Sequence, residues 1–513
     1  MRASLASSIA VTCAAVLALP VSLAAPAAAT APPAVAALPP GPERLPGSTQ
    51  SLPLEPLDGS VRGFGGESGS DPGEQGLARR DVRPFSLVGV VWDDPTAALH
   101  GTVQVRTRAT GDGAWSEWQD VETHNDEHGA DPETAEGAAR ALKGSTAPLW
   151  VGDSDGVEIR VRGEEQLPEG LRLELVDPGE GPASAAPRSR AAMVSAGPTA
   201  AEAAASAVNA QLAPYGATWI PALSKEQTEV TFRHFTMPAI PAVPAMPAVP
   251  AVPAVPAVPA MHAVPAMPAV PAMAARPARP PHAAPIAAVA PVAPVVPIAA
   301  APAVAAVAAK PYIGPRPGII TRKGWGADEK LREKGFVYTK TIKAAFVHHS
   351  ATGNNYTCSQ APSVLRGIYR YHVQSSGWRD FGYNFAIDKC GNIYEGRAGG
   401  VAKPVLGAHT LGFNTNSMGI AVLGTYSKTN PPAAVLTAVA KLTAWKLGLH
   451  GVNPNTTTYL TSGGGNLYKK GTKVKLRTIA GHRDGFATEC PGARLYGKLS
   501  TARTTSAKYQ GRL

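Results

Sequence analysis

The sequence of 513 residues has only four cysteines, Cys13, Cys358, Cys390 and Cys490. Cys13 lies in an apolar run that follows one arginine and ends in small residues, the pattern of a cleaved secretory signal. We therefore expect residues 1–29 to be a signal peptide and the mature protein to be secreted. Three cysteines would remain, and in an oxidising compartment this odd number allows one disulfide and one unpaired thiol, or no disulfide.

Long apolar runs are missing after the signal because prolines interrupt the candidates, so we expect no stable membrane span. The most proline-rich stretch contains "MPAIPAVPAMPAVPAVPAVPAVPAM", in which proline recurs at every third position. Periodic glycine is absent there, which excludes a collagen-like triple helix. Because a polyproline II helix has three residues per turn, we interpret residues 181–314 as a low-complexity Pro/Ala-rich linker.

Acidic residues are scarce in the last part of the chain. Residues 311–513 carry 28 Lys/Arg and 8 Asp/Glu, whereas the rest of the chain carries 20 and 30. A basic unit in an exported protein favours a polyanionic partner, and outside the cell that indicates an anionic wall polymer or lipid rather than nucleic acid. The alternative is that the basic residues only keep the surface soluble.

The N-terminal half shows two kinds of composition. Residues 30–80 are rich in proline, glycine and charge, which predicts an unstructured segment. Residues 81–180 contain alternating runs such as "GTVQVRTRA" and "GVEIRVRG" between turn sequences, which predict a small all-β sandwich domain. Trp115 and Trp118, beside a predicted hairpin turn, fit either a sugar-stacking platform or ordinary packing.

Strand and helix patterns alternate over residues 315–505. "KAAFVHHSA" and "SMGIAVLGTY" are typical of buried strands, and "PPAAVLTAVAKLTAWKLGLHG" has helical spacing with proline at its start and glycine at its end. This alternation predicts one α/β domain in which helices flank a mixed central β-sheet.

The same domain contains side chains that could hold a metal ion. A catalytic zinc site uses three protein ligands, drawn from histidine, thiolate and carboxylate, and leaves a fourth position for water. His348 in "FVHHS", His482 in "AGHRD" and Cys490 in "TECPG" are the candidates. Since His348 and His349 point to opposite faces of a strand, only one of them can face a given cleft. The alternative is an inert buried cysteine with hydrogen-bonded core histidines.

Five motifs occur in order: "RKGWGA", "FVHHSAT", "GWRDFGYNFAIDKCGNIYEGR", "GAHTLGFNTNSMGIAVLG" and "AGHRDGFATECPG". This series resembles the peptidoglycan recognition protein family, which includes the bacteriophage lysozyme-type zinc amidases. The resemblance implies a peptidoglycan recognition protein-like amidase domain that binds Zn²⁺ through His348, His482 and Cys490. It also implies hydrolysis of the amide bond between N-acetylmuramic acid and L-alanine in peptidoglycan.

The resemblance assigns two further catalytic side chains. Tyr383 matches the family's catalytic tyrosine, which would position the water or donate to the oxyanion. Thr488 matches a position where family members place Lys or Thr, and its hydroxyl would be a weaker donor than an ammonium. A related group uses a glutamate on the strand "SMGIAVLG", and its absence here favours a tyrosine-assisted mechanism.

Other motif residues are expected around the cleft. The resemblance makes His409 a substrate-binding residue, with Asn414 as a second candidate. Glu395 and Arg397 are expected to form a structural ion pair beside the cleft. With Cys490 assigned to the metal, the other two cysteines of the mature chain remain as the predicted disulfide, Cys358–Cys390.

The resemblance leaves two functions open besides the amidase. Some family members bind wall fragments without cutting them, so a non-catalytic peptidoglycan-binding module is the alternative. In those binders serine typically replaces the ligand cysteine, whereas this chain has Cys490. A third possibility is an adhesive wall protein whose basic domain holds anionic polymer. We therefore expect a secreted enzyme of the cell wall whose partner is peptidoglycan.

Overall fold

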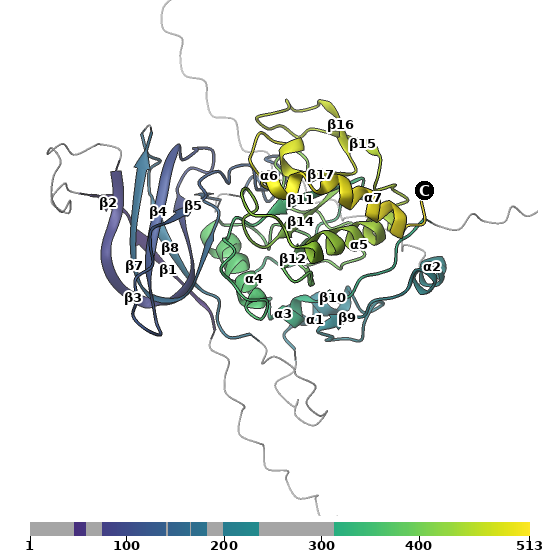
Figure 1. Cartoon of the computed structure of the whole chain (residues 1–513), viewed down its shortest axis with the longest axis horizontal. Helices are drawn as coiled ribbons and strands as arrows, with labels where there is room; N and C mark the ends of the chain where they lie inside the picture. The colour runs from purple at the N-terminus through teal and green to yellow at the C-terminus, as the bar shows by residue number, and fades with distance from the viewer. Residues whose placement is uncertain are drawn as a thin grey trace, which may run out of the picture.

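The computed structural model describes residues 46–57, 74–139, 142–164, 166–181, 198–234 and 312–512. The predicted signal peptide and the repeats of "PAV" lie outside the described residues. Two domains lie side by side, an all-β domain and a larger α/β domain (Figure 1). This arrangement confirms the predicted fold classes of both parts. No helix of the described residues is long and apolar enough to cross a membrane.

The N-terminal domain is built around one long strand, β3 (Glu74–Trp92). β7 pairs with most of its length, with three register shifts along the way, and β8 pairs with its last part. The hydrogen-bonded sheet has the order β1-β8-β3-β7-β4-β5, and β2 and β6 also pair with β3. The remaining strands are β1 (Ser48–Pro53), β2 (Glu55–Pro56), β4 (Gly101–Ala109), β5 (Gln119–Val121), β6 (Gly144–Ser145), β7 (Leu149–Gly163) and β8 (Arg172–Asp177).

The prediction that residues 30–80 are unstructured is wrong for two parts of that range. All six residues of β1 pair with β8, and β3 already begins at Glu74. β1 is an edge strand, so proline at its end is tolerated and most of its side chains stay partly exposed. Such a strand is held by its main chain, and its composition therefore does not distinguish it from a loop.

The C-terminal domain has a mixed sheet with the order β17-β11-β14-β12-β13-β10-β9. β11 lies between two parallel neighbours, and only the pairs β12–β13 and β10–β9 are antiparallel. The strands are β9 (Trp219–Ile220), β10 (Ile319–Ile320), β11 (Ala344–His349), β12 (Phe385–Ile387), β13 (Ile393–Glu395), β14 (Ser417–Val422) and β17 (Ile479–Gly481), and a separate hairpin joins β15 (Thr457–Thr461) to β16 (Lys473–Arg477).

Helices cover both faces of this sheet (Figure 1). The longest, α5, starts after Pro432 and packs with α7 against the core formed by the sheet. The helices of this domain are α3 (Arg322–Trp325), α4 (Ala361–Arg370), α5 (Ala433–Leu449), α6 (Ala493–Tyr496) and α7 (Leu499–Tyr509), with a π turn at Tyr371–Ser375 and a 3₁₀ turn at His482–Asp484.

Part of the predicted linker is folded instead. Residues 198–234 form α1 (Ala200–Ala207), β9 and α2 (Lys225–His234), and β9 extends the sheet of the C-terminal domain. Thr199 and Glu202 form a capping box that starts α1. The alanines of this segment look like low complexity, but alanine is also the best helix former. The prediction that residues 181–314 are a continuous linker is therefore wrong over this segment.

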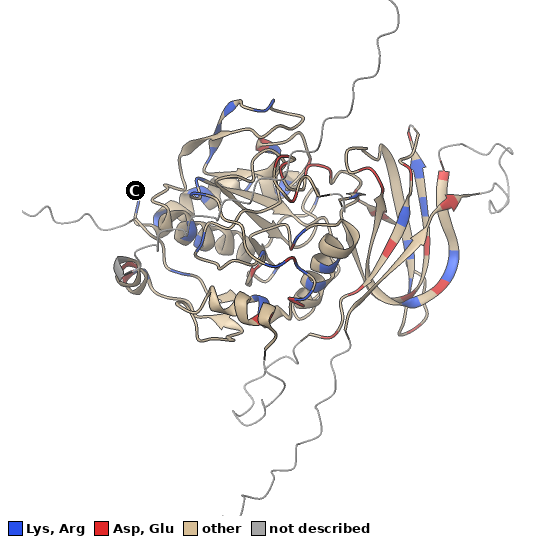
Figure 2. Ribbon diagram, turned by 180° about the vertical axis from the view of Figure 1, so that it is seen from behind, with Lys and Arg blue, Asp and Glu red and all other residues tan. Residues whose placement is uncertain are grey.

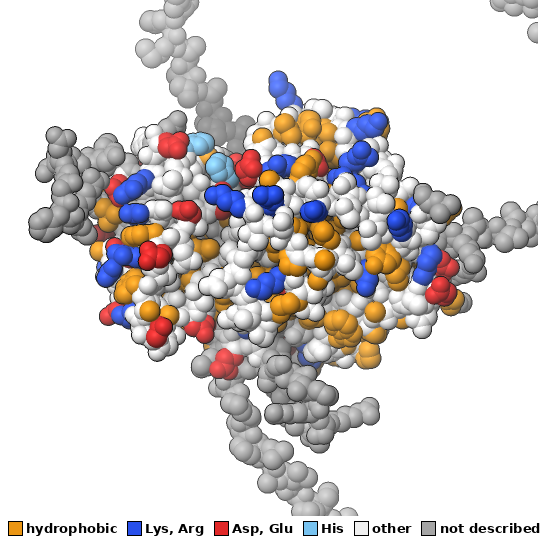
Figure 3. Space-filling view, viewed as in Figure 1, with side chains coloured by type: hydrophobic (Ala, Val, Ile, Leu, Met, Phe, Trp, Pro, Cys, Tyr) orange, Lys and Arg blue, Asp and Glu red, His pale blue; other side chains and the backbone are white. Residues whose placement is uncertain are grey.

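The two domains share a buried apolar core. Leu87 and Trp150 of the β domain belong to the same cluster of buried side chains as Leu365 and Ile368 of α4. The Tyr371 hydroxyl lies 3.2 Å and 3.1 Å from the backbone carbonyls of Val90 and Thr146 and donates to this pair. On the face shown in Figure 3 the two domains form one continuous surface.

A candidate metal centre at the domain boundary

The three predicted metal ligands lie together. His348 is near the carboxyl end of β11, and His482 directly follows β17, the parallel neighbour of β11. Parallel strands end at the same edge of a sheet, which brings the two rings together. The 3₁₀ turn and the following loop return Cys490 to this edge, where its carbonyl accepts a hydrogen bond of 3.0 Å from the Arg483 amide.

The distances between these side chains suit a tetrahedral metal ion. Nδ1 of His348 lies 3.1 Å from Nδ1 of His482 and 3.7 Å from Sγ of Cys490. Zinc bonds of the usual lengths at tetrahedral angles place nitrogen and sulfur ligand atoms about 3.3–3.6 Å apart. The second ring nitrogen of His348, Nε2, lies 3.4 Å from the Thr410 hydroxyl, which leaves Nδ1 free to face the metal.

Burial sets the protonation of these groups. It lowers the pKa of His348 and of His482 well below the usual value, and neighbouring histidines add to the effect, so both rings are neutral. Burial, and next the charge of Glu127, raise the pKa of the Cys490 thiol well above its usual value. Without a metal the protonated thiol is therefore favoured, whereas a bound cation would favour the thiolate because it stabilises the negative charge directly.

A fourth side chain joins the cluster from the other domain. The candidate ligand atoms of His128, His348, His482 and Cys490 all lie within 4.8 Å of one another. His128 belongs to the connection between β5 and β6, and its ring meets that of His482 edge-on at a centroid distance of 4.6 Å. Only 7% of its side chain is exposed, and neither ring nitrogen has a hydrogen-bond partner. Buried polar atoms without partners are rare, and here the ring belongs to a group of four side chains that could hold a metal ion.

Sequence analysis missed His128. The only signal was the segment "HNDEHG" in a domain with few histidines, and its spacing matches no metal motif. His349, the residue after His348 on β11, points away from the cluster, as the alternation of side chains along a strand predicts. Its Nδ1 accepts a hydrogen bond of 3.2 Å from the Tyr426 amide and takes no part in the cluster.

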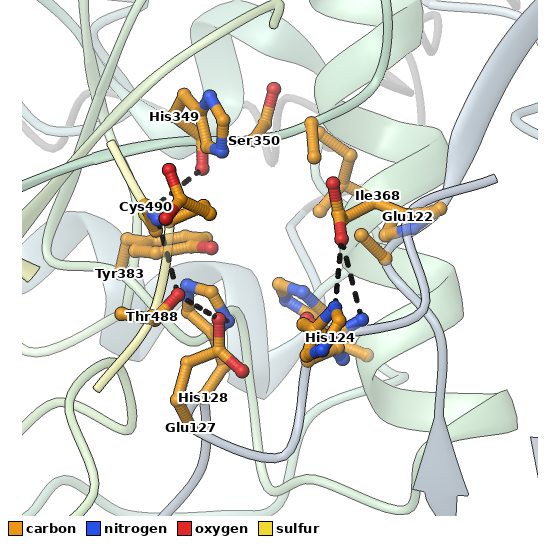
Figure 4. Close-up of a pocket in the computed structure, with 16 residues that line it drawn as sticks. Glu122, His124, Glu127, His128, His349, Ser350, Ile368, Tyr383, Thr488 and Cys490 are labelled. Atoms are coloured by element: carbon orange, nitrogen blue, oxygen red, sulfur yellow. Dashed lines mark hydrogen bonds and ion pairs between the residues drawn. The ribbon is translucent and has the colours of Figure 1, made fainter. Parts of the chain in front are cut away.

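Both predicted catalytic side chains border the cluster. Tyr383 is buried, and its ring centroid lies 5.2 Å from that of His348. Burial raises the pKa of its phenol well above the usual value, so the group is a neutral donor. The Thr488 hydroxyl donates a hydrogen bond of 2.6 Å to Oε1 of Glu127 and accepts one of 3.1 Å from the Cys490 amide (Figure 4).

The predicted substrate-binding residues are fully buried. The His409 ring lies beside His348 at a centroid distance of 5.3 Å, and its Nδ1 is 3.0 Å from the Thr410 hydroxyl. Oδ1 of Asn414 accepts hydrogen bonds from the amides of His409 and Thr410. Its Nδ2 donates to the carbonyl of Gly129, in the β domain. In this conformation both residues support the site from within and do not face solvent.

The expected ion pair between Glu395 and Arg397 does not form. Arg397 instead makes a two-pronged ion pair with Glu136 of the β domain, at 2.7 Å and 2.8 Å. Glu395 accepts hydrogen bonds from Asn209, in the segment that follows α1, and from the Arg322 amide. β13 ends at Glu395, so Arg397 lies beyond the strand and its side chain is not held beside that of Glu395 by strand geometry.

The predicted disulfide is present in the structure. Cys358 and Cys390 form a disulfide between the loop before α4 and the turn between β12 and β13. Cys490 is a buried free cysteine.

Arginine side chains lie over both tryptophan rings, Arg79 over Trp115 and Arg160 over Trp118, so these faces are already packed. The packing alternative therefore fits the pair better than a sugar-stacking platform.

A cavity of about 20 Å³ lies beside the cluster. Cys490 and Tyr383 line it from the C-terminal domain, and Glu127 and His128 line it from the β domain (Figure 4). A cavity of this size holds about one water molecule. A sugar linked to a peptide cannot enter it in this conformation.

Two family descriptions match the chain. Residues 33–202 match "Rv3811 N-terminal galactose-binding domain-like", and residues 338–493 match the N-acetylmuramoyl-L-alanine amidase family. Peptidoglycan-recognition protein SC2 of Drosophila melanogaster is 30% identical over 36% of this chain and 85% of its own length. N-acetylmuramoyl-L-alanine amidase of Homo sapiens is 29% identical over 36% of this chain and 28% of its own length.

A solved structure of wild-type Drosophila PGRP-LB is 28% identical over 36% of this chain and 92% of that chain, with a TM-score of 0.28. The sequence matches support peptidoglycan binding or an amidase-type activity for the C-terminal domain. The chain therefore belongs to the peptidoglycan recognition protein family, in which its C-terminal domain matches the N-acetylmuramoyl-L-alanine amidases.

Proposed function

We propose that this protein is a secreted zinc-dependent N-acetylmuramoyl-L-alanine amidase that acts on cell-wall peptidoglycan. The observation that carries the proposal is the packing of His348, His482 and Cys490 at distances that suit tetrahedral zinc. Secretion rests on the signal-like residues 1–29, and the wall as partner rests on the relatives and on the basic C-terminal domain.

Zinc bound there would polarise the scissile carbonyl and lower the pKa of a bound water to about 7. The chain's own residues would supply orientation and hydrogen bonds. The Thr410 hydroxyl and the buried His409 ring hold the His348 ring in place. The neutral Tyr383 phenol borders the same cavity and can donate to the oxygen on which negative charge develops.

A non-catalytic peptidoglycan-binding module is the second candidate. It is favoured by the relatives that are named only as recognition proteins. Cys490 favours the enzyme, since peptidoglycan binding alone needs no buried thiol between two histidines. The two functions differ in product formation, which can be measured directly.

The test uses the zinc-loaded full chain and its Cys490→Ser variant on purified peptidoglycan, followed by mass spectrometry. We expect free L-alanine amino termini with intact glycan strands from the wild-type chain over a long incubation, and none from the variant. Peptidoglycan that is bound but unchanged by both proteins would indicate the binding module. Cleavage between sugars would contradict the proposed bond.

A further inference from the structure

We infer that His128 of the β domain is a fourth metal ligand, so that the amidase is held latent with its metal position closed. This inference rests on the proposed function. A catalytic zinc site needs one open position for water, whereas four protein ligands are typical of closed, structural sites. The cover loop, which we define as residues 122–139, would therefore occupy the position that the reaction requires.

The His128 ring is placed for this role. Its centroid lies 4.6 Å from that of His482 and 5.3 Å from that of His348. Both of its ring nitrogens are buried without a hydrogen-bond partner, and the carboxylate of Glu127 is 3.9 Å from Nδ1, beyond hydrogen-bond distance. The sheet of its own domain therefore gives this ring no polar contact, and the cluster with the C-terminal ligands is its polar environment.

The cover loop also engages the catalytic side of the cleft. Oε1 of Glu127 accepts the hydrogen bond of 2.6 Å from the Thr488 hydroxyl. A hydroxyl has one proton to donate, and that of Thr488 is directed at Glu127 and not toward a substrate oxygen. The cavity that remains has room for about one water. The cover loop thus occupies the fourth metal position with His128, engages the Thr488 hydroxyl with Glu127, and narrows the cavity beside the metal.

Acidic groups fix the cover loop to the C-terminal domain. The loop contains six Asp or Glu residues and no Lys or Arg, and it meets a domain with a strong basic excess (Figure 2). Oδ1 of Asp131 accepts hydrogen bonds of 2.7 Å from the Gly412 amide and 2.9 Å from Asn414. Glu136 forms the buried two-pronged pair with Arg397, and Glu133 pairs with Lys470.

These contacts have the character of a reversible closure. Most are polar, and they join the loop to residues that sequence analysis places in the substrate cleft, such as Asn414. Substrate could bind there only after the loop leaves. Displacement of His128 would then open the metal position and release Thr488 in one movement.

The experiment compares the full chain with His128→Ala and with a matched control, His124→Ala. His124 belongs to the same loop, but its side chain is 72% exposed and lies outside the cluster. Each protein is loaded with Co²⁺ in place of zinc, and its visible spectrum is recorded before and after addition of azide. Turnover of a soluble muropeptide is measured on the zinc-loaded proteins.

We expect wild type and His124→Ala to show the spectrum of a four-coordinate cobalt that azide leaves unchanged. His128→Ala should bind azide, with a clear spectral change, because a small anion can reach the vacated position. Its turnover should rise about tenfold or more as the closed population falls. A second variant, Glu136→Ala, should raise turnover in the same direction, with the exposed Glu117→Ala as its control.

The outcomes separate the inference from the proposed function. Identical spectra and equal azide binding in wild type and His128→Ala would overturn the inference, even if both proteins hydrolyse substrate. A wild-type chain that binds no cobalt would overturn it as well. If azide binds only His128→Ala and no variant releases L-alanine termini, His128 is a ligand and the amidase proposal fails.

Discussion

The two sides of the metal cluster differ in how they are held. His348 and His482 are fixed by adjacent parallel strands, and Cys490 by the 3₁₀ turn and loop that follow. His128, in contrast, belongs to the long connection between β5 and β6 and reaches the cluster from a different domain. A rigid set of three ligands with a fourth on a connecting loop is what a reversible closure of the site requires.

The two sides of the cluster also differ in charge, because the cover loop is acidic and the C-terminal domain is basic. The C-terminal domain has a strong basic excess, and the acidic cover loop docks on it through ion pairs. Arg397 and Lys470 of the C-terminal domain are the cations with which the loop pairs. Variants of the C-terminal ligands should therefore abolish hydrolysis, whereas variants of the cover loop should only open the metal site.

The largest effect is expected from Cys490→Ser. The variant is made in the His128→Ala background, where two histidines and a neutral hydroxyl remain, and these bind zinc poorly because the soft thiolate is lost from the site. We expect bound zinc to fall far below one equivalent and hydrolysis to drop to background. Metal analysis and turnover of a soluble muropeptide measure both. Retained hydrolysis without bound zinc would contradict the role of the rigid ligand set.

Tyr383→Phe should keep the metal and lose rate. Removal of one hydrogen-bond donor to a developing oxyanion costs about 10²–10³ in rate. The measurement is best made in the His128→Ala background, where the site is open, with zinc content as the control. Loss of zinc from the variant would show that the phenol supports the ligands instead of the substrate.

Glu136→Ala should weaken the fixation of the cover loop. It removes the carboxylate partner of the buried Arg397 guanidinium, which costs about 3 kcal/mol when both partners are buried. We expect a lower free energy of unfolding and faster proteolytic cleavage within residues 122–139. Glu117→Ala, at an exposed site, is the control and should change neither. Equal protease resistance in the two variants would argue against Glu136 as an anchor.

The smallest effect is expected from Tyr371→Phe at the shared core. It removes the hydroxyl that donates to the carbonyls of Val90 and Thr146 but keeps the apolar packing. The free energy of unfolding should fall by about 1 kcal/mol, measured by denaturant titration. Metal content and turnover should not change, since Tyr371 is not a member of the cluster and does not line the cavity beside it. A tenfold rise in turnover would show that the core contact also controls closure.

Local sequence could predict that the three candidate ligands come together, because each of them lies in a short motif. His348, His482 and Cys490 sit within strand ends and a turn whose patterns can be read directly. The pairing of Glu136 with Arg397 and the approach of His128 could not be predicted, since both join residues more than two hundred positions apart in different domains. β1 and the segment from 198 to 234 were missed because their composition is that of a loop or linker.

The most direct test of the account is a crystal structure of the zinc-loaded full chain. We predict one zinc ion bound by Nδ1 of His348, Nδ1 of His482, Sγ of Cys490 and a ring nitrogen of His128, with Glu127 still bonded to Thr488. A zinc ion with water as its fourth ligand and His128 turned away would contradict the closure. Zinc bound elsewhere, or a Cys490 outside its coordination, would contradict the proposed amidase site itself.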